Sequence, residues 1–289
     1  MYQKVEKNYE FEMSFGLKSI LQPIMFPFSL LGLCLAFGQM PFDLPLLAFF
    51  SLVLLGYLWQ RLSLDLAGAF RCGFAFGFSY FAITFAWIIQ PFLIEPYAFG
   101  WIAPFAFLGL VGILSICWAV AFSSAAYLSN GKSRLKKLLM LWATLSLMEI
   151  FRSDLIFNFP WGLISAIWIN TSISQALSLC GPHGLTSIII LSAFLVSKPI
   201  FSSVLGSLLL STLFFFGTKR LNEPLLPKNH QFYIRVVQPN IPQAEKWEPA
   251  LAQEFLQLHL GLSKVEHDDN VDLIVWPETA INFFFEYDE

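Results

Sequence analysis

Near the end of the sequence, one carboxylate is well placed by its neighbours to do chemistry. Glu278 follows Trp276 and Pro277, and these three residues close the apolar run at positions 271–275. The run predicts a buried β-strand, and the proline ends its hydrogen-bond ladder, so we expect Glu278 at the strand's carboxyl end. A carboxylate fixed at such a point can serve as a general base. The residues alone leave open the alternative that Glu278 is a solvated loop residue.

The segment before Glu278 has the pattern of a βαβ unit. Residues 232–237 are β-branched and aromatic, which predicts a first strand. Between the two strands, apolar residues recur at spacings of four and three, as on an amphipathic helix: Leu251, Phe255, Leu258, Leu262 and Val265. The strands of such a unit are parallel, and active sites lie beyond their carboxyl ends. We therefore expect Gln238, Asn240 and Glu278 to converge on one edge of the sheet.

No group of residues predicts a metal site or a bound cofactor. The four cysteines, Cys34, Cys72, Cys117 and Cys180, lie in or beside apolar stretches without CxxC or metal-ligand spacing. We interpret them as small packing residues. The four histidines are scattered along the chain. A net charge of −3 gives no cationic footprint for nucleic acid, so we expect no nucleic-acid partner.

The composition places most of the chain in a membrane. Hydrophobic residues make up 56% of the sequence and charged residues only 13%, against about 25% charged residues in soluble domains. Seven stretches approach the roughly 20 apolar residues that a bilayer core requires. They are residues 19–38, 44–60, 67–89, 101–128, 136–152, 176–197 and 199–217. The predicted fold class is an all-α bundle of about seven transmembrane helices followed by the start of an α/β domain.

These patterns divide the chain into four parts. Residues 1–18 form a short amino-terminal segment, and residues 19–217 form the transmembrane helical domain. Residues 218–230 are a linker. Residues 231–289 contain the charges, histidines and alternation of the α/β segment.

The lysine and arginine residues predict an orientation. The loops that carry most of them share one side of the membrane: Lys4, Lys7, Lys18, Arg61, Lys132, Arg134, Lys136, Lys137 and Lys198. The opposite loops, at 39–43, 90–100 and 153–175, contain neither residue type. Because basic loops stay in the cytoplasm, the amino terminus is expected there and the α/β segment outside. Lys219 and Arg220, after the last span, are the exception.

A charged pair within a predicted span calls for a reason, because charges are costly in the bilayer. Glu149 and Arg152 lie three residues apart, so they share a helix face. They are either a structural ion pair or a contact to a lipid head group or the outer domain. The aromatic loop at 157–162 is either an interfacial belt or a contact for a lipid substrate. Gly73 and Gly77 form a GxxxG pattern, which we interpret as helix packing.

Several motifs together make the chain resemble the bacterial apolipoprotein N-acyltransferases, membrane-embedded members of the nitrilase (carbon–nitrogen hydrolase) superfamily. In the α/β segment they are residues 236–243 (VVQPNIPQ), Lys246 with Trp247, and residues 274–280 (IVWPETA). In the membrane domain they are residues 149–152 (EIFR), 159–161 (FPW) and 181–185 (GPHGL). The resemblance covers nearly the whole chain.

The resemblance implies a function and a site. Members of that family transfer a fatty acyl group from a phospholipid to the amine of the diacylglyceryl-cysteine of an apolipoprotein. The implied fold of residues 231–289 is the first part of an α-β-β-α nitrilase sandwich, on the periplasmic side of the inner membrane. The nitrilase triad is Glu, Lys and Cys. Glu278 matches the glutamate, the general base, and Trp247 matches a tryptophan of the active-site region.

The triad's lysine and cysteine have no match in this sequence. Covalent acyl transfer requires a cysteine thiolate, so we expect the chain to be the amino-terminal part of the enzyme and inactive alone. Two alternatives remain on the residues: a non-enzymatic multi-span protein, such as a transporter or scaffold with a short outer docking segment, and a membrane-anchored carbon–nitrogen hydrolase of other specificity.

Overall fold

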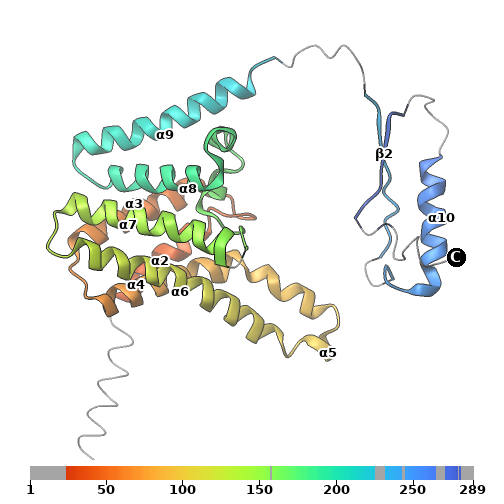
Figure 1. The fold of residues 1–289 in the computed structure, drawn as a ribbon, viewed down its shortest axis with the longest axis horizontal. Helices are drawn as coiled ribbons and strands as arrows, with labels where there is room; N and C mark the ends of the chain where they lie inside the picture. The colour runs from red at the N-terminus through yellow and green to blue at the C-terminus, as the bar shows by residue number, and fades with distance from the viewer. Residues whose placement is uncertain are drawn as a thin grey trace, which may run out of the picture. The chain divides into compact units, whose positions relative to one another are not determined.

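A computed structural model describes residues 24–156, 158–224, 232–242, 245–264, 271–278 and 280. The chain divides into two compact units, Met1–Glu223 and Pro224–Glu289. The first unit is helical, and the second combines two strands with a helix (Figure 1). Each is described by itself below.

Seven α-helices of more than ten residues form the described part of the first unit (Figure 1). They are α2 (Met25–Ala36), α3 (Pro45–Arg61), α4 (Leu66–Thr84), α6 (Ala103–Ser129), α7 (Arg134–Ile150), α8 (Leu177–Val196) and α9 (Ile200–Leu221). Short helical segments join them: η1 (Ala86–Leu93), α5 (Pro96–Phe99), the π-helix η2 (Phe151–Ile156), η3 (Ile164–Trp168) and η4 (Ser172–Ala176).

Four helical segments are long and apolar enough to cross a membrane: Leu66–Thr84, Ala103–Ser129, Ser172–Val196 and Ile200–Leu221. Helices α2 and α3 are apolar but shorter, and α7 has 17 residues. The helices are therefore consistent with a helical membrane region, and the count of seven spans stays a prediction. The first expected span, 19–38, begins outside the described residues.

One expected span ends earlier than its apolar pattern does. The span predicted at 67–89 is α-helical only as far as Thr84, and the chain continues as the 3-10 helix η1. Pro91 lies within η1 and has no amide hydrogen to donate, so the α-helical ladder could not run through it.

Small residues let the helices approach one another closely. Helix α4 packs against α2 and α6. A Cβ atom built on Gly32 would lie 2.0 Å from the backbone oxygen of Phe76, and one built on Gly73 would lie 2.8 Å from Phe122. A Cβ on Gly77 would lie 3.2 Å from Ser115. These contacts confirm the interpretation of Gly73 and Gly77 as packing residues, since their missing side chains admit α6.

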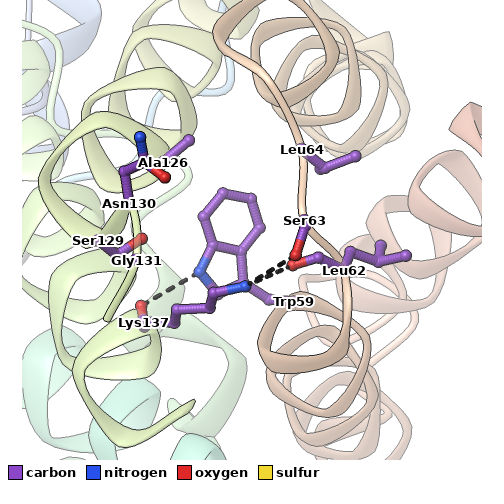
Figure 2. Close-up of a pocket in the computed structure, with 9 residues that line it drawn as sticks. All are labelled: Trp59, Leu62, Ser63, Leu64, Ala126, Ser129, Asn130, Gly131 and Lys137. Carbon is purple, nitrogen blue, oxygen red and sulfur yellow. Dashed lines mark hydrogen bonds between the residues drawn. The ribbon is translucent and has the colours of Figure 1, made fainter. Parts of the chain in front are cut away.

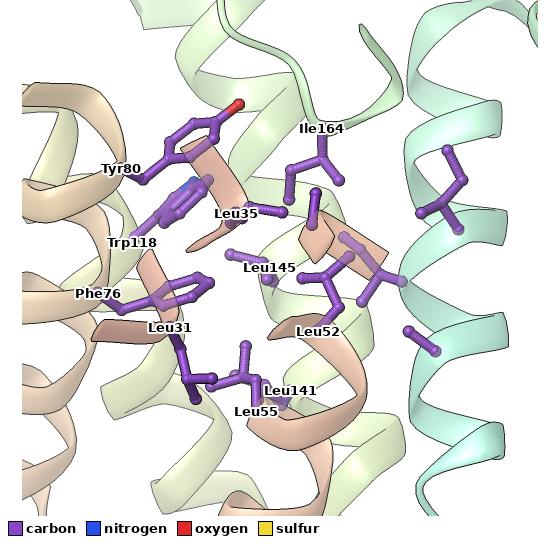
Figure 3. Close-up of a cluster of buried hydrophobic side chains, with 14 of the residues drawn as sticks. Leu31, Leu35, Leu52, Leu55, Phe76, Tyr80, Trp118, Leu141, Leu145 and Ile164 are labelled. Carbon is purple, nitrogen blue, oxygen red and sulfur yellow. The ribbon is translucent and has the colours of Figure 1, made fainter. Parts of the chain in front are cut away.

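The core of the helical unit is made of aliphatic side chains beside an aromatic stack (Figure 3). The ring of Trp118 lies 5.1 Å from that of Phe76 and 4.9 Å from that of Tyr80, in stacked geometry. Leucines from three other helices fill the space beside the stack: Leu31, Leu35, Leu52, Leu55, Leu141 and Leu145. The outer faces remain apolar, and Phe105 and Phe201 are 71% and 86% exposed. Apolar side chains on both the inside and the outside suit a lipid environment.

The second unit has the predicted strand–helix–strand order. Strand β1 (Ile234–Val236) and strand β2 (Leu273–Val275) are parallel, with Val236 opposite Val275. Helix α10 (Ala252–Ser263) lies between them in sequence, after the short turn η5 (Pro249–Leu251). Val265, the last residue of the expected helical stripe, lies outside the described residues.

Strand β2 is less buried than its apolar sequence predicts. Leu273, Ile274 and Val275 are 40–46% exposed. The reason is the small number of elements around it: among the described residues β2 pairs with β1 alone, and α10 approaches through its carboxyl-terminal half. The complete nitrilase sandwich therefore stays a prediction.

Candidate functional site

The residues that follow the two parallel strands lie at one edge of the second unit. The backbone amide of Val237 donates to the carbonyl oxygen of Val275 at 2.9 Å, so the chains remain paired as far as the strand ends. Gln238 and Asn240 follow β1, and Pro277 follows β2. Asn240 has φ 55°, a left-handed conformation that asparagine tolerates better than most residues. The two segments thus turn away from the strands side by side.

A cavity of about 120 Å³ lies at this edge. Gln238, Asn240 and Pro277 contribute to its wall together with Lys246 and His259. The predicted convergence therefore holds for the two amides. Glu278 adjoins Pro277, and its backbone oxygen accepts a hydrogen bond from Lys246 Nζ at 2.9 Å. The Glu278 side chain itself is exposed and is not part of the cavity wall.

Trp247, the second predicted site residue, lies in the turn that also carries Lys246. Its side chain is 61% exposed. Because Lys246 is bonded to the Glu278 backbone, this turn is held close to the segment that follows β2. The structure thus links the two predicted site residues through Lys246, which the sequence motif contained but to which no role in the site had been assigned.

His259 is a second residue of the edge that sequence reasoning missed. It is fully buried, and its ring centre lies 5.2 Å from that of Trp276. Its Nδ1 lies 2.7 Å from the carbonyl oxygen of Phe255, so a neutral ring donates there and presents Nε2 as an acceptor. Nε2 is buried without a partner among the described residues. The available signal was its position four residues after Phe255, on the apolar stripe of the helix.

Hydrogen bonds fix helix α10 against the strands. Trp276 Nε1 donates to Ser263 Oγ at 2.8 Å, and Arg235 Nη1 donates to the Ser263 carbonyl oxygen at 2.6 Å. Ser263 Oγ in turn donates to the carbonyl oxygen of His259 at 2.7 Å. These hydrogen bonds therefore hold the elements that carry the polar residues of the edge in fixed positions.

Among the described residues, no group of three or more His, Cys, Asp or Glu side chains could hold a metal ion.

In the helical unit, the predicted pair of Glu149 and Arg152 is formed and buried. Arg152 Nε lies 2.9 Å from Glu149 Oε1 and Nη2 lies 3.0 Å from Oε2, and both side chains are 0% exposed. Trp118 Nε1 also donates to Oε1, at 2.7 Å. A fully buried pair with these partners favours the structural alternative over a direct contact to a lipid head group.

The same arginine holds the aromatic loop. Its Nη1 donates to the carbonyl oxygens of Phe159 and Trp161 at 3.3 and 2.9 Å, and Nη2 donates to that of Gly162 at 3.2 Å. Tyr80 donates its hydroxyl to the Gly162 carbonyl at 3.0 Å. These bonds satisfy loop carbonyls that have no helical partner. The loop is thereby fixed with the Trp161 ring 54% exposed.

A third motif, residues 181–185, joins α8 to the π-helix η2. Gly181 has φ 65° and precedes Pro182, which kinks α8. His183 Nε2 then lies 2.9 Å from Asp154 Oδ2 and 3.4 Å from Ser153 Oγ. The kink therefore places a histidine beside the carboxylate of the segment that follows Arg152.

The amino-acid sequence is similar to those of known proteins. A family model described as "Apolipoprotein N-acyltransferase N-terminal domain" matches residues 31–195, which include the buried pair and the two loop motifs. The apolipoprotein N-acyltransferase of Agrobacterium fabrum is 33% identical over 229 residues, covering 74% of this chain and 42% of that protein. That of Rickettsia prowazekii is 32% identical over 244 residues, covering 81% and 48%. That of Sinorhizobium medicae is 30% identical over 277 residues, covering 88% and 51%. The chain thus spans about half the length of the curated relatives that it matches, and it belongs to the apolipoprotein N-acyltransferase family.

Proposed function

We propose that this chain serves the N-acylation of apolipoproteins, as the names of its relatives imply. In the proposed reaction a cysteine thiolate attacks the ester carbonyl of a phospholipid and releases a lysophospholipid. The resulting thioester is then attacked by the amine of a diacylglyceryl-cysteine, which becomes an amide and frees the thiol. The substrates are a phospholipid donor and a diacylated apolipoprotein acceptor.

Within that reaction we assign Glu278 as the general base that takes the thiol proton. The observation that carries the assignment is its place three residues after the end of β2, next to Pro277 in the wall of the cavity that Gln238 and Asn240 also line. Lys246 supports it by holding the backbone of Glu278 at that edge. Trp247, in the same turn, is proposed to contact substrate. Its exposed ring is available for such a contact.

The nucleophile of this proposal is not one of the four cysteines of the chain. Cys34, Cys72, Cys117 and Cys180 lie on helices α2, α4, α6 and α8 of the helical unit. The family triad also contains a cysteine nucleophile and a lysine that stabilises the oxyanion, and neither has a match in this sequence.

We also propose that the amino terminus is cytoplasmic and that the second unit lies outside the inner membrane. The contacts within the helical unit support this orientation. Lys137 Nζ bonds to the Leu62 carbonyl oxygen, and Gln60 bonds to the Ser197 carbonyl oxygen, so three basic loops lie at one end of the bundle. At loops free of lysine and arginine, Gln39 bonds to the Leu163 carbonyl oxygen at 3.1 Å. The two kinds of loop are therefore segregated, as the positive-inside rule requires.

The assignment of Glu278 is tested in a complete enzyme, with this segment joined to the carboxyl-terminal half of a relative. Glu278→Gln keeps the shape of the side chain but cannot accept the proton, so acyl transfer should fall by about 10² to 10⁴-fold. Glu254→Gln is the matched control, because Glu254 is exposed in the first turn of α10. Near-normal transfer by a stably folded Glu278→Gln enzyme would show that Glu278 is only a loop residue.

A further inference from the structure

A pocket of about 80 Å³ opens at the basic end of the helical unit (Figure 2). Its wall is formed by the end of α3 and the segment that joins it to α4, and by the end of α6, the segment that follows it and the first turn of α7. The indole of Trp59 lies at its centre in Figure 2, between Lys137 and Ser63. Trp59 is only 4% exposed, so this side of the pocket is a fixed part of the bundle.

Lys137 is the cation built into this pocket. Its Nζ donates to the carbonyl oxygen of Leu62 at 2.9 Å and to Ser63 Oγ at 3.4 Å. Its own carbonyl oxygen accepts a hydrogen bond from Trp59 Nε1 at 3.1 Å. An ammonium group carries three N–H bonds, and these two acceptors occupy two of them. Lys137 is thus held in place with one donor left for a ligand oxygen.

The charges around the pocket are strongly of one sign. The two connecting segments, residues 61–65 and 130–137, carry five cationic side chains and one acidic side chain. The acid, Asp65, is already engaged, because its Oδ1 accepts a hydrogen bond from the Gly68 amide at 2.9 Å. The pocket therefore complements an anion and would repel a cation.

An apolar hollow of about 350 Å³ lies between residues of helices α4 and α6. It is lined by Leu66 at the start of α4 and by Ser123, Ser124, Tyr127 and Leu128 near the end of α6. The pocket is lined by Leu64 and Ala126, so the two hollows use neighbouring residues of the same segments. Helices α4 and α6 are both apolar enough to cross a membrane, so this hollow would face acyl chains.

We propose that the pocket and the hollow together bind one anionic phospholipid, with its phosphate at Lys137 and one acyl chain along α4 and α6. Basic pockets between membrane helices recognise the head groups of such lipids, and the apolar hollow favours a lipid over a free phosphate ion. All lining residues of this site belong to the helical unit, and the proposal does not depend on acyl transfer.

The test measures lipid binding to the purified chain in neutral detergent by native mass spectrometry. Phosphatidylglycerol and phosphatidylcholine with identical acyl chains are titrated in parallel, and glycerol 3-phosphate is added as a competitor. We expect phosphatidylglycerol to bind in a 1:1 complex in preference to phosphatidylcholine. Glycerol 3-phosphate at equal concentration should leave that complex intact, because it lacks the acyl chain.

Variants separate the pocket from general surface charge. Lys137→Gln should weaken phosphatidylglycerol binding about tenfold, the usual effect of losing a charge-assisted hydrogen bond. Lys136→Gln removes the same charge from the neighbouring residue, which is exposed and outside the pocket wall, and should change binding little. Ser124→Trp fills the apolar hollow without touching Lys137 and should also weaken binding. It keeps the test decisive if Lys137→Gln fails to fold.

Any of four results would overturn the proposal. One is equal binding of phosphatidylglycerol and phosphatidylcholine. Another is an equal loss of binding in Lys136→Gln and Lys137→Gln, which would indicate diffuse surface charge. The other two are full displacement by glycerol 3-phosphate and unchanged binding in a folded Ser124→Trp variant, either of which would remove the acyl chain from the site.

Discussion

Arg152 and Glu149 form a doubly hydrogen-bonded ion pair in which neither side chain is exposed. The pair also supplies donors to three carbonyl oxygens of residues 159–162. It therefore has two tasks: it neutralises charges inside the helical unit and fixes the aromatic loop. Removing one partner would leave the other as an unpaired buried charge.

This relationship predicts a large loss of stability in Arg152→Met. The variant leaves the Glu149 carboxylate buried and the loop carbonyls unsatisfied, so the free energy of unfolding should fall by about 3–5 kcal/mol. Arg134→Met, at the exposed start of α7, is the matched control. Thermal unfolding in detergent measures both. The double variant Glu149→Leu/Arg152→Met should be more stable than Arg152→Met alone. Equal melting of Arg152→Met and Arg134→Met would contradict this role of the pair.

A second prediction concerns the close approach of α2 and α4. Gly32→Ala would bring a Cβ atom to 2.0 Å from the Phe76 backbone oxygen, so the helices must separate and the unfolding temperature should fall. Gly109→Ala is the control, because nothing lies within 4 Å of its Cβ position in α6. Alanine favours a helix over glycine, so the control should be unchanged or slightly more stable. A folded Gly32→Ala protein as stable as the control would show that the helices pack less closely than described.

The orientation can be read from reporter fusions. A reporter placed after Lys132 should report the cytoplasm, and reporters placed after His230 or Asp269 should report the outer compartment, because of the lysine and arginine distribution. Cytoplasmic signals from both of the latter fusions would contradict the proposed orientation or the number of spans.

The last prediction concerns the chain by itself. Purified and incubated with phospholipid, it should form no acyl thioester, because its four cysteines lie on helices of the helical unit and none matches the triad cysteine of the family. Mass spectrometry before and after hydroxylamine treatment detects such an adduct. A hydroxylamine-labile acyl group on Cys34, Cys72, Cys117 or Cys180 would show that the nucleophile had been misassigned.

The sequence by itself determined the elements and several of their contacts. Apolar runs predicted the membrane helices, because hydrophobic length alone decides whether a segment suits a bilayer. The strand–helix–strand order followed from two short runs rich in β-branched, aromatic or apolar residues on either side of an apolar stripe of helical period. The spacing of Glu149 and Arg152 placed them on one helix face. Hydrophobic length, residue spacing and the type of each element depend on neighbouring residues in the chain, so the sequence alone can predict them.

Only the tertiary structure decided where the polar groups of distant segments meet. The carbonyl oxygens that bind Arg152 belong to the backbone, which has no signature in the sequence. His259 was one of four scattered histidines until α10 placed it beside Trp276. The sequence showed Lys137 only as a basic loop residue, and the structure places its Nζ in a hydrogen bond with the segment after α3. Such contacts depend on packing between segments far apart in the chain, and no local period encodes that packing.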